Sequence, residues 1–249
     1  MSKIRKEKNK GAISAIKDIF PSWKSLKRLL LIAFEILLPI LIITFTVLYV
    51  NLQKLEVPFH YKQLLKSTTQ IMLLVEGVPI TSGTGVSIAQ EEEHSYILTV
   101  DHICEYQKEQ IDIGMQVISF DGIRYHADIV SRSPKDDLCL LKIDASIPKV
   151  KVYQKNLQFA DPVIGIGAPL GMFPMPSHGN FSYYDTYDNR YFLSFPIAPG
   201  FSGGPILFKN RLVGIVSQTV DRYESFCLAI PAPTVQEFLD NYFNDVRTE

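Results

Sequence analysis

The chain has 249 residues, of which 47% are hydrophobic and 20% are charged. This length and composition allow one or two compact units with a hydrophobic core and exclude a disordered chain. The formal net charge is −1, and the residues from 51 onward carry no basic patch, so nucleic acid is excluded as the expected partner.

The first 28 residues are strongly basic. They contain nine Lys or Arg side chains and two acidic ones, Glu7 and Asp18. Within them, residues 11–28 mix apolar side chains with lysines and one tryptophan, which fits a membrane-surface amphipathic segment or a partly ordered tail equally well. We expect residues 1–28 to form a basic cytoplasmic tail.

A long apolar segment follows at Leu29–Val50, with the sequence LLLIAFEILLPILIITFTVLYV. As a helix it is about 33 Å long, which is enough to cross the bilayer core. A buried core helix and a cleavable signal peptide are the weaker alternatives, because the run is long and no small-residue cleavage site follows it. The basic flank predicts a single-pass transmembrane helix at 29–50, with the N-terminus in the cytoplasm and the bulk of the chain outside it.

The remaining residues predict an all-β unit that ends in one helix. After a linker at 51–66, we predict strands at Ser95–Val100, Met115–Phe120, Ile123–Val130, Leu138–Ile143 and Arg211–Val220. Asp121-Gly122 is a two-residue hairpin signal. Apolar residues return to helical spacing at Pro233–Val246, and Gly171–Arg190 predicts a long loop because it is rich in Pro, Ser, Tyr and Asn.

Three cysteines, Cys104, Cys139 and Cys227, show no metal-type spacing. Two of them lie in or beside apolar runs, which favours buried small hydrophobic side chains. At most one disulfide can form, so the chain has no disulfide framework of the kind seen in small exported domains.

Three residues are candidates for nucleophilic catalysis. Ser202 lies among glycines, which let a substrate backbone approach and let backbone N–H groups converge on one point. A serine hydroxyl needs a base and an acid that orients the base. His102 follows the hydrophobic strand at 95–100, and Asp137 precedes the apolar run at 138–143, so both are candidates for these roles.

Six sequence words in a fixed order resemble the trypsin-like (chymotrypsin-fold) serine peptidases, and more closely their HtrA (Deg) branch. The words span most of the chain after the apolar segment: Gly83–Val86, Ile97–His102, Asp137–Ile143, Gly165–Gly171, Pro199–Pro205 and Phe226–Pro231. The resemblance implies a two-barrel fold, with β-barrels at 67–148 and 149–232 and a C-terminal helix at 233–249. It also implies His102 as general base, Asp137 as the residue that orients it, Ser202 as nucleophile, and the backbone N–H groups of Gly200 and Ser202 as the oxyanion hole.

Two positions depart from the family pattern. Phe201 stands where trypsin-like digestive enzymes have Asp and HtrA-like enzymes usually have Asn, so activation by a new N-terminus that pairs with Asp is not expected. Pro196 stands where enzymes that cut after Lys or Arg have Asp, which favours cleavage after small or medium apolar residues. The resemblance places the specificity pocket at Pro196, Ile197, Ala198, Ser217, Gln218, Thr219 and Leu228.

The expected function is that of a membrane-anchored serine endopeptidase that hydrolyses peptide bonds in proteins. No cofactor and no metal are expected. HtrA-like proteases commonly carry a PDZ domain after the catalytic domain, whereas this chain ends after one helix, which favours a simple membrane-tethered peptidase. The alternative is a catalytically silent protease-like domain that binds a protein partner at the membrane.

Overall fold

A computed structural model describes residues 23–55, 59–105, 113–153, 156–220 and 223–248. The chain divides into two units, Met1–Pro58 and Phe59–Glu249. Most of the predicted basic tail, residues 1–22, lies outside the described residues. In the first unit, helix α2 (Trp23–Leu55) contains the predicted membrane span and is longer than it at both ends. Among the described residues, α2 is the one helix whose length and composition would allow it to cross a membrane.

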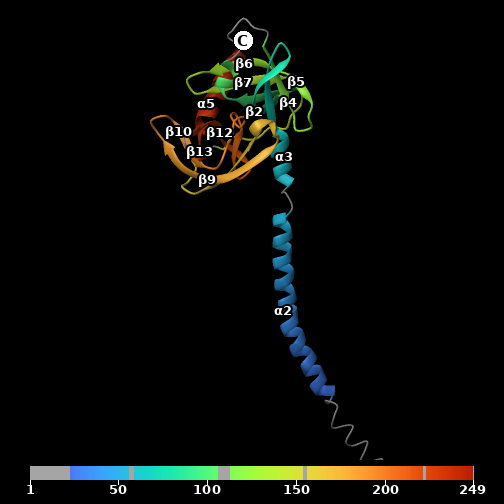
Figure 1. The fold of residues 1–249 in the computed structure, drawn as a ribbon. Helices are drawn as coiled ribbons and strands as arrows, with labels where there is room; N and C mark the ends of the chain where they lie inside the picture. Colours follow the sequence, from blue (N-terminus) through green and yellow to red (C-terminus); the bar gives the residue numbers. More distant parts are fainter. Residues whose placement is uncertain (1–22, 56–58, 106–112, 154–155, 221–222, 249) are drawn as a thin grey trace, which may run out of the picture. The chain divides into compact units, whose positions relative to one another are not determined.

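The second unit begins with helix α3 (Phe59–Ser67) and the strands of a seven-stranded antiparallel sheet (Figure 1). The strands are β1 (Thr68–Val75), β2 (Val78–Glu91), β3 (His94–Thr99), β4 (Ile113–Ile118), β5 (Arg124–His126), β6 (Asp128–Ser133) and β7 (Leu138–Ile143). Their order in the sheet is β5-β4-β1-β2-β3-β7-β6. Apolar side chains of β1, β3 and β7 fill its core, because these strands carry near-continuous apolar runs.

The later strands form a closed barrel in the order β10-β13-β12-β11-β8-β9. Its strands are β8 (Pro162–Gly167), β9 (Met175–Asp185), β10 (Arg190–Ser194), β11 (Pro205–Phe208), β12 (Arg211–Val220) and β13 (Tyr223–Pro231). A short 3₁₀ helix, η2 (Pro169–Gly171), joins β8 to β9. A second hydrophobic cluster, centred on Phe195 and Phe201, fills this barrel.

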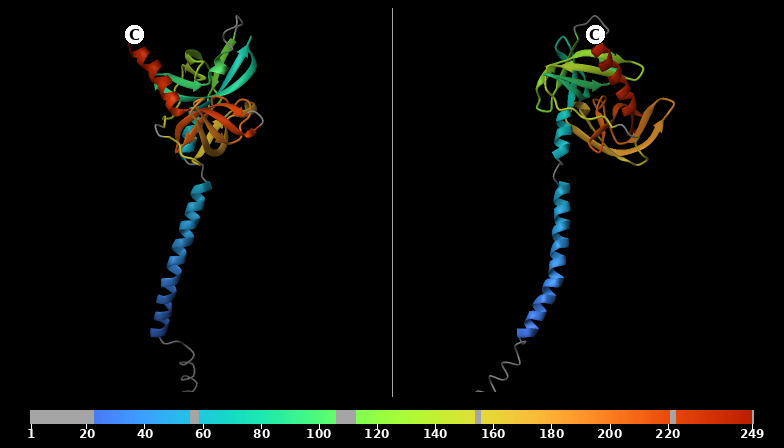
Figure 2. Two further views of the ribbon diagram at one scale, coloured as in Figure 1. Left: turned by 90° about the vertical axis from the view of Figure 1, so that its left-hand side faces the viewer. Right: turned by 180° about the vertical axis from the view of Figure 1, so that it is seen from behind.

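Helix α5 (Ala232–Thr248) ties the two β layers together. It packs against β12 and β13 of the barrel (Figure 2). It also contacts the sheet, where the rings of Tyr242 and Phe243 lie 5.9 and 5.1 Å from the ring of Tyr96 in β3. Aromatic contacts of this kind add to the stabilisation from burial, so α5 fixes the sheet against the barrel.

The structure differs from the sequence-based expectations in three places. The predicted loop at Gly171–Arg190 is wrong for most of its length, because β9 occupies Met175–Asp185 and pairs with both β8 and β10. The predicted strand at Ile123–Val130 is divided into β5 and β6. Within the expected linker at 51–66, α2 continues to Leu55 and α3 begins at Phe59. The predicted strands Leu138–Ile143 and Arg211–Val220 are confirmed as β7 and β12.

Candidate active site

His102 and Asp137 come from two neighbouring strands of the sheet. His102 lies on α4 (Asp101–Cys104), a single helical turn directly after β3, and Asp137 immediately precedes β7. Because β3 and β7 are antiparallel and Thr99 pairs with Cys139, the end of β3 meets the start of β7. Asp137 has a φ of 61°, a left-handed conformation that Asp tolerates better than most residues.

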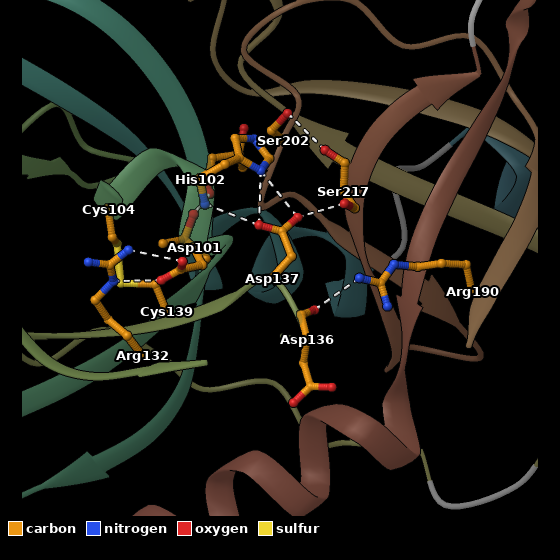
Figure 3. A network of polar contacts seen from close by, with 12 residues as sticks. Asp101, His102, Cys104, Arg132, Asp136, Asp137, Cys139, Arg190, Ser202 and Ser217 are labelled. Atoms are coloured by element: carbon orange, nitrogen blue, oxygen red, sulfur yellow. Dashed lines mark hydrogen bonds and ion pairs between the residues drawn. A yellow bond between two sulfur atoms is a disulfide. The ribbon is translucent and has the colours of Figure 1, made fainter. Parts of the chain in front are cut away.

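The two side chains are joined by hydrogen bonds (Figure 3). The His102 Nδ1 atom lies 3.0 and 3.1 Å from the two carboxylate oxygens of Asp137, and the His102 backbone N–H donates to Oδ1 at 3.1 Å. The Ser217 hydroxyl donates to Asp137 Oδ2 at 2.6 Å. Burial alone would raise the pKa of Asp137, but the hydrogen bonds from His102 and Ser217 outweigh it and hold the pKa below its ordinary value. Asp137 is therefore an ionised acceptor at neutral pH.

Ser202 comes from the other β layer, in the turn between β10 and β11. Its hydroxyl donates to the backbone carbonyl of Ser217 at 3.1 Å. Among the described residues no hydrogen bond joins this hydroxyl to His102, although the imidazole lies between Asp137 and Ser202 (Figure 3). Catalytic hydrogen bonds are often long or poorly aligned in ligand-free enzymes and tighten when substrate binds, so the pairing of Ser202 with His102 stays a prediction.

The turn before Ser202 leaves two backbone donors free. Among the bonds of the described residues, the N–H groups of Gly200 and Ser202 have no acceptor. Gly200 has a φ of 99°, and a Cβ there would collide with the carbonyl oxygen of Ala168. Only glycine therefore fits this position, and the oxyanion hole at the Gly200 and Ser202 N–H groups stays a prediction.

Thr84, in β2 of the sheet, holds this turn in place. Its hydroxyl donates to the Gly200 carbonyl at 2.7 Å and accepts from the Ala168 N–H at 3.0 Å. Its own backbone N–H donates to the Ser202 carbonyl at 2.8 Å. Thr84 is fully buried, so the sheet anchors the Ser202 turn through two hydrogen bonds, and the third joins Thr84 to the segment after β8.

Phe201 points away from the site and into the barrel core. Its side chain is 2% exposed, and its ring centroid lies 6.3 Å from that of Phe195. The ring also covers Gly167, where an added Cβ would meet ring atoms at 2.6–2.8 Å. Phe201, which stands where the family has Asp or Asn, is therefore packed among apolar side chains.

The predicted pocket residues come from segments that precede and follow Ser202 in the chain. Pro196, Ile197 and Ala198 are in the segment between β10 and β11, Gln218 and Thr219 are exposed near the end of β12, and Leu228 on β13 pairs with Gln218. Ser217, also predicted in the pocket, uses its hydroxyl on Asp137 and its carbonyl on Ser202. The pocket assignment itself stays a prediction.

Sequence reasoning missed several supports of the site. All three cysteines are buried, as expected, but Cys104 and Cys139 form a disulfide that the sequence had not favoured, and Cys227 is free. The carboxylate of Asp101 and the guanidinium of Arg132 form an ion pair that was not foreseen. One signal was available: each of the bonded cysteines stands two residues after a candidate triad residue.

A family model for the trypsin-like peptidase domain matches residues 83–215, which is more than half of the chain. The chain belongs to the trypsin-like peptidase family. The matched segment runs from the residue before Thr84 to the middle of β12 and includes His102, Asp137 and Ser202. Ser217 lies just beyond it.

Curated relatives support the HtrA-like branch of this family. The chain is 29% identical over 177 residues to a probable periplasmic serine endoprotease DegP-like of Chlamydia trachomatis, covering 66% of this chain and 34% of the relative. It is 30% identical over 185 residues to a protein of the same description from Marinomonas, covering 68% of this chain and 37% of the relative. The chain thus spans about a third of the length of these relatives.

A solved structure supports the fold. The crystal structure of a serine endoprotease from Yersinia pestis superposes with a TM-score of 0.65 at 23% identity, covering 76% of this chain and 69% of that one. The predicted all-β, two-barrel chymotrypsin-like fold with a C-terminal helix is confirmed, with the first barrel formed by the seven-stranded sheet and the second closed.

Proposed function

We propose that this chain is a membrane-anchored serine endopeptidase in which His102, Asp137 and Ser202 form the catalytic triad. The observation that carries the proposal is the hydrogen-bonded pair of His102 and Asp137, which lies on the sheet side of Ser202. Asp137 accepts from Nδ1, which leaves the other imidazole nitrogen, Nε2, available to accept the Ser202 proton.

The proposed reaction is acyl transfer. The Ser202 oxygen attacks the scissile carbonyl carbon while His102 takes the hydroxyl proton, and the N–H groups of Gly200 and Ser202 donate to the developing oxyanion. His102 then gives the proton to the leaving amine as the C–N bond breaks. A water molecule, deprotonated by His102, then attacks the acyl carbon; the ester bond to Ser202 breaks, His102 returns the proton to the serine oxygen, and the new carboxyl end is released.

The end of β12 is suited to hold an extended peptide. β12 pairs with β13 from Gly214 to Val220, but β11 pairs with it only as far as Ile215. Gln218 and Thr219 are exposed beyond that point, so a substrate backbone can add to this free edge beside Ser202. Leu228 pairs with Gln218 at this edge, and there is no acidic residue among the predicted pocket residues, so we expect small or medium apolar side chains at the cleaved bond.

The membrane anchor and the location belong to the same proposal. The described helix Trp23–Tyr49 has the length and composition of a membrane span, although an N-terminal signal sequence shares these properties. The basic residues that precede it favour a cytoplasmic N-terminus. The Cys104–Cys139 disulfide supports an oxidising, extracytoplasmic compartment for the domain, in keeping with the word periplasmic in the names of its relatives.

A fluorophosphonate probe tests the proposal directly, because it reacts with activated serine hydroxyls. We expect the full chain, purified in detergent micelles, to be labelled at Ser202 and to cleave an unstructured protein such as casein. Ser202→Ala should abolish both. A folded wild-type chain that is neither labelled nor active on casein would support the alternative, a catalytically silent domain that binds a protein partner.

A further inference from the structure

His102 lies on a helix that cannot hold its position alone. α4 has four residues, and no side chain caps its N-terminus. Short isolated helices are unstable in water, because a single turn gains too few hydrogen bonds to offset its loss of conformational freedom. The orientation of His102 relative to Asp137 must therefore be fixed by contacts from outside α4.

Three side chains of α4 are buried; Ile103 packs in the core, and Asp101 and Cys104 make specific bonds on either side of His102. Asp101 and Cys104 are three residues apart, a spacing that places them on one face of a helix. The Asp101 carboxylate accepts two hydrogen bonds from the Arg132 guanidinium, at 2.6 and 2.9 Å. Cys104 is bonded to Cys139. Figure 3 shows both connections beside the His102–Asp137 pair.

The two attachment points on the sheet are direct neighbours. Arg132 in β6 and Cys139 in β7 are paired across the ladder. Asp101, Cys104 and Cys139 are all buried, at 5%, 0% and 0% exposure. The ion pair and the disulfide therefore form one clasp (Asp101, Cys104, Arg132 and Cys139), which fastens one face of α4 to a single site on the sheet.

The disulfide of the clasp also links His102 and Asp137 covalently, over a much shorter path than the main chain between them. Cys104 is two residues after His102, and Cys139 is two residues after Asp137. A change in the Cys104–Cys139 connection is thereby passed to the hydrogen bonds between His102 and Asp137. Displacing a catalytic group by about 1 Å can lower the rate of reaction roughly 100-fold.

We propose that Cys104 and Cys139, supported by the Asp101–Arg132 ion pair, are positioning residues of the active site, whose disulfide holds His102 in register with Asp137. This inference rests on the proposed triad. It makes the reactivity of Ser202 depend on the oxidation state of two buried sulfur atoms that touch neither substrate nor nucleophile.

The test uses the full chain in detergent micelles and the rate of fluorophosphonate labelling at Ser202. The test variant is Cys104→Ala/Cys139→Ala, and the matched control is Ile143→Ala. Ile143 is buried at the far end of β7, so its truncation destabilises the same sheet without touching α4. We expect the maximal labelling rate of the double variant to fall roughly 10- to 100-fold while the probe concentration at half-maximal rate is unchanged. The control, measured well below its unfolding temperature, should label as the wild type does.

Reversible reduction provides a second arm that removes no packing atoms and works even if the double variant does not fold. In a Cys227→Ala background, the disulfide supplies the only two cysteines. Dithiothreitol should slow labelling as two thiols appear by mass spectrometry, and oxidised glutathione should restore the rate.

The outcomes separate this inference from the function it rests on. An unlabelled wild type would overturn the triad itself. A wild type labelled at Ser202, together with a folded double variant or a fully reduced protein that reacts equally fast, would overturn the clasp and leave the proposed function standing.

Discussion

The Ser217 hydroxyl donates to the Asp137 carboxylate at 2.6 Å, the shortest of the hydrogen bonds that this carboxylate accepts. Ser217 belongs to the barrel and Asp137 to the sheet, so the bond crosses between the two β layers. Nearby, Arg190 of β10 donates to the backbone carbonyl of Asp136 at 3.2 Å. The Asp137 carboxylate, which bonds His102, is thus also bonded by a residue of the barrel that carries Ser202.

Replacing Ser217 tests whether its role is to hold Asp137 or to line the pocket. Hydrogen bonds to charged groups contribute about 1.5–3 kcal/mol, so we expect Ser217→Ala to lower kcat roughly 10- to 100-fold with little change in KM. Ser217→Thr keeps the hydroxyl and should retain most of the activity. A raised KM with unchanged kcat in the alanine variant would instead assign Ser217 to substrate binding.

The Thr84 hydroxyl offers a second test of the Ser202 turn. Thr84→Val has nearly the same shape but leaves the Gly200 carbonyl and the Ala168 N–H without partners, at a cost of about 1–3 kcal/mol for each buried group. Because Gly200 carries one of the proposed oxyanion donors, fluorophosphonate labelling should slow as well. Thr84→Ser, which keeps the hydroxyl, is the control. A valine variant that is less stable but reacts at the wild-type rate would limit Thr84 to a role in folding.

The lowered pKa of Asp137 predicts how stability depends on pH. An ordinary Asp titrates near pH 3.9 in an unfolded chain, and the folded value is lower. As the pH falls, the unfolded state therefore binds a proton at Asp137 before the folded state does. The contribution of Asp137 is fully present above about pH 4 and is lost as the pH falls through the folded pKa.

This dependence is measured by urea unfolding in a Ser202→Ala background, which prevents self-digestion. At pH 7 the protein with Asp137 should be more stable than the Asp137→Asn variant. The difference between their free energies of unfolding should shrink below pH 4. A difference that stays constant down to pH 3 would show that the ionised carboxylate is not the source of the stabilisation.

The sequence predicted those parts of the fold that depend on local pattern. β7 and β12 coincide with apolar runs, and α5 follows the helical spacing of its apolar residues. β9 was missed because Pro176, Gly179 and neighbouring polar residues disfavour a strand, yet pairing with β8 and β10 imposes one. Tertiary pairing of this kind leaves no local signal.

Local patterns gave His102, Asp137 and Ser202 as separate candidates, and the family resemblance was needed to group them into one site. His102 and Asp137 are 35 residues apart, and their contact depends on the register between β3 and β7. The Cys104–Cys139 bond depends on the same register, and its one sequence signal was that each cysteine stands two residues after a candidate triad residue. The family words covered the triad, but the clasp on α4 involves Asp101 and Arg132, and Arg132 lies outside those words.

The burial of Phe201 leads to a last prediction, on activation. In the digestive enzymes that the sequence resembles, an Asp at this position pairs with a new N-terminus, whereas the Phe201 ring is packed on Phe195 and over Gly167. Apolar packing of Phe201 thus holds the Ser202 turn, and no ion pair with a newly formed N-terminus is needed. We expect the full chain to react with a fluorophosphonate probe without prior cleavage, as shown by intact mass spectrometry of the labelled protein.

The packing of Phe201 can be removed in two steps. Phe201→Ala should lower the free energy of unfolding by about 3–5 kcal/mol because it leaves a cavity in the barrel core, and it should also slow labelling at Ser202. Phe201→Leu fills more of the cavity, so its free energy of unfolding and its labelling rate at Ser202 should both fall less than those of Phe201→Ala. If labelling instead appears only after the N-terminal segment has been cleaved, a processing step would be required and the packing of Phe201 would not suffice to hold the turn.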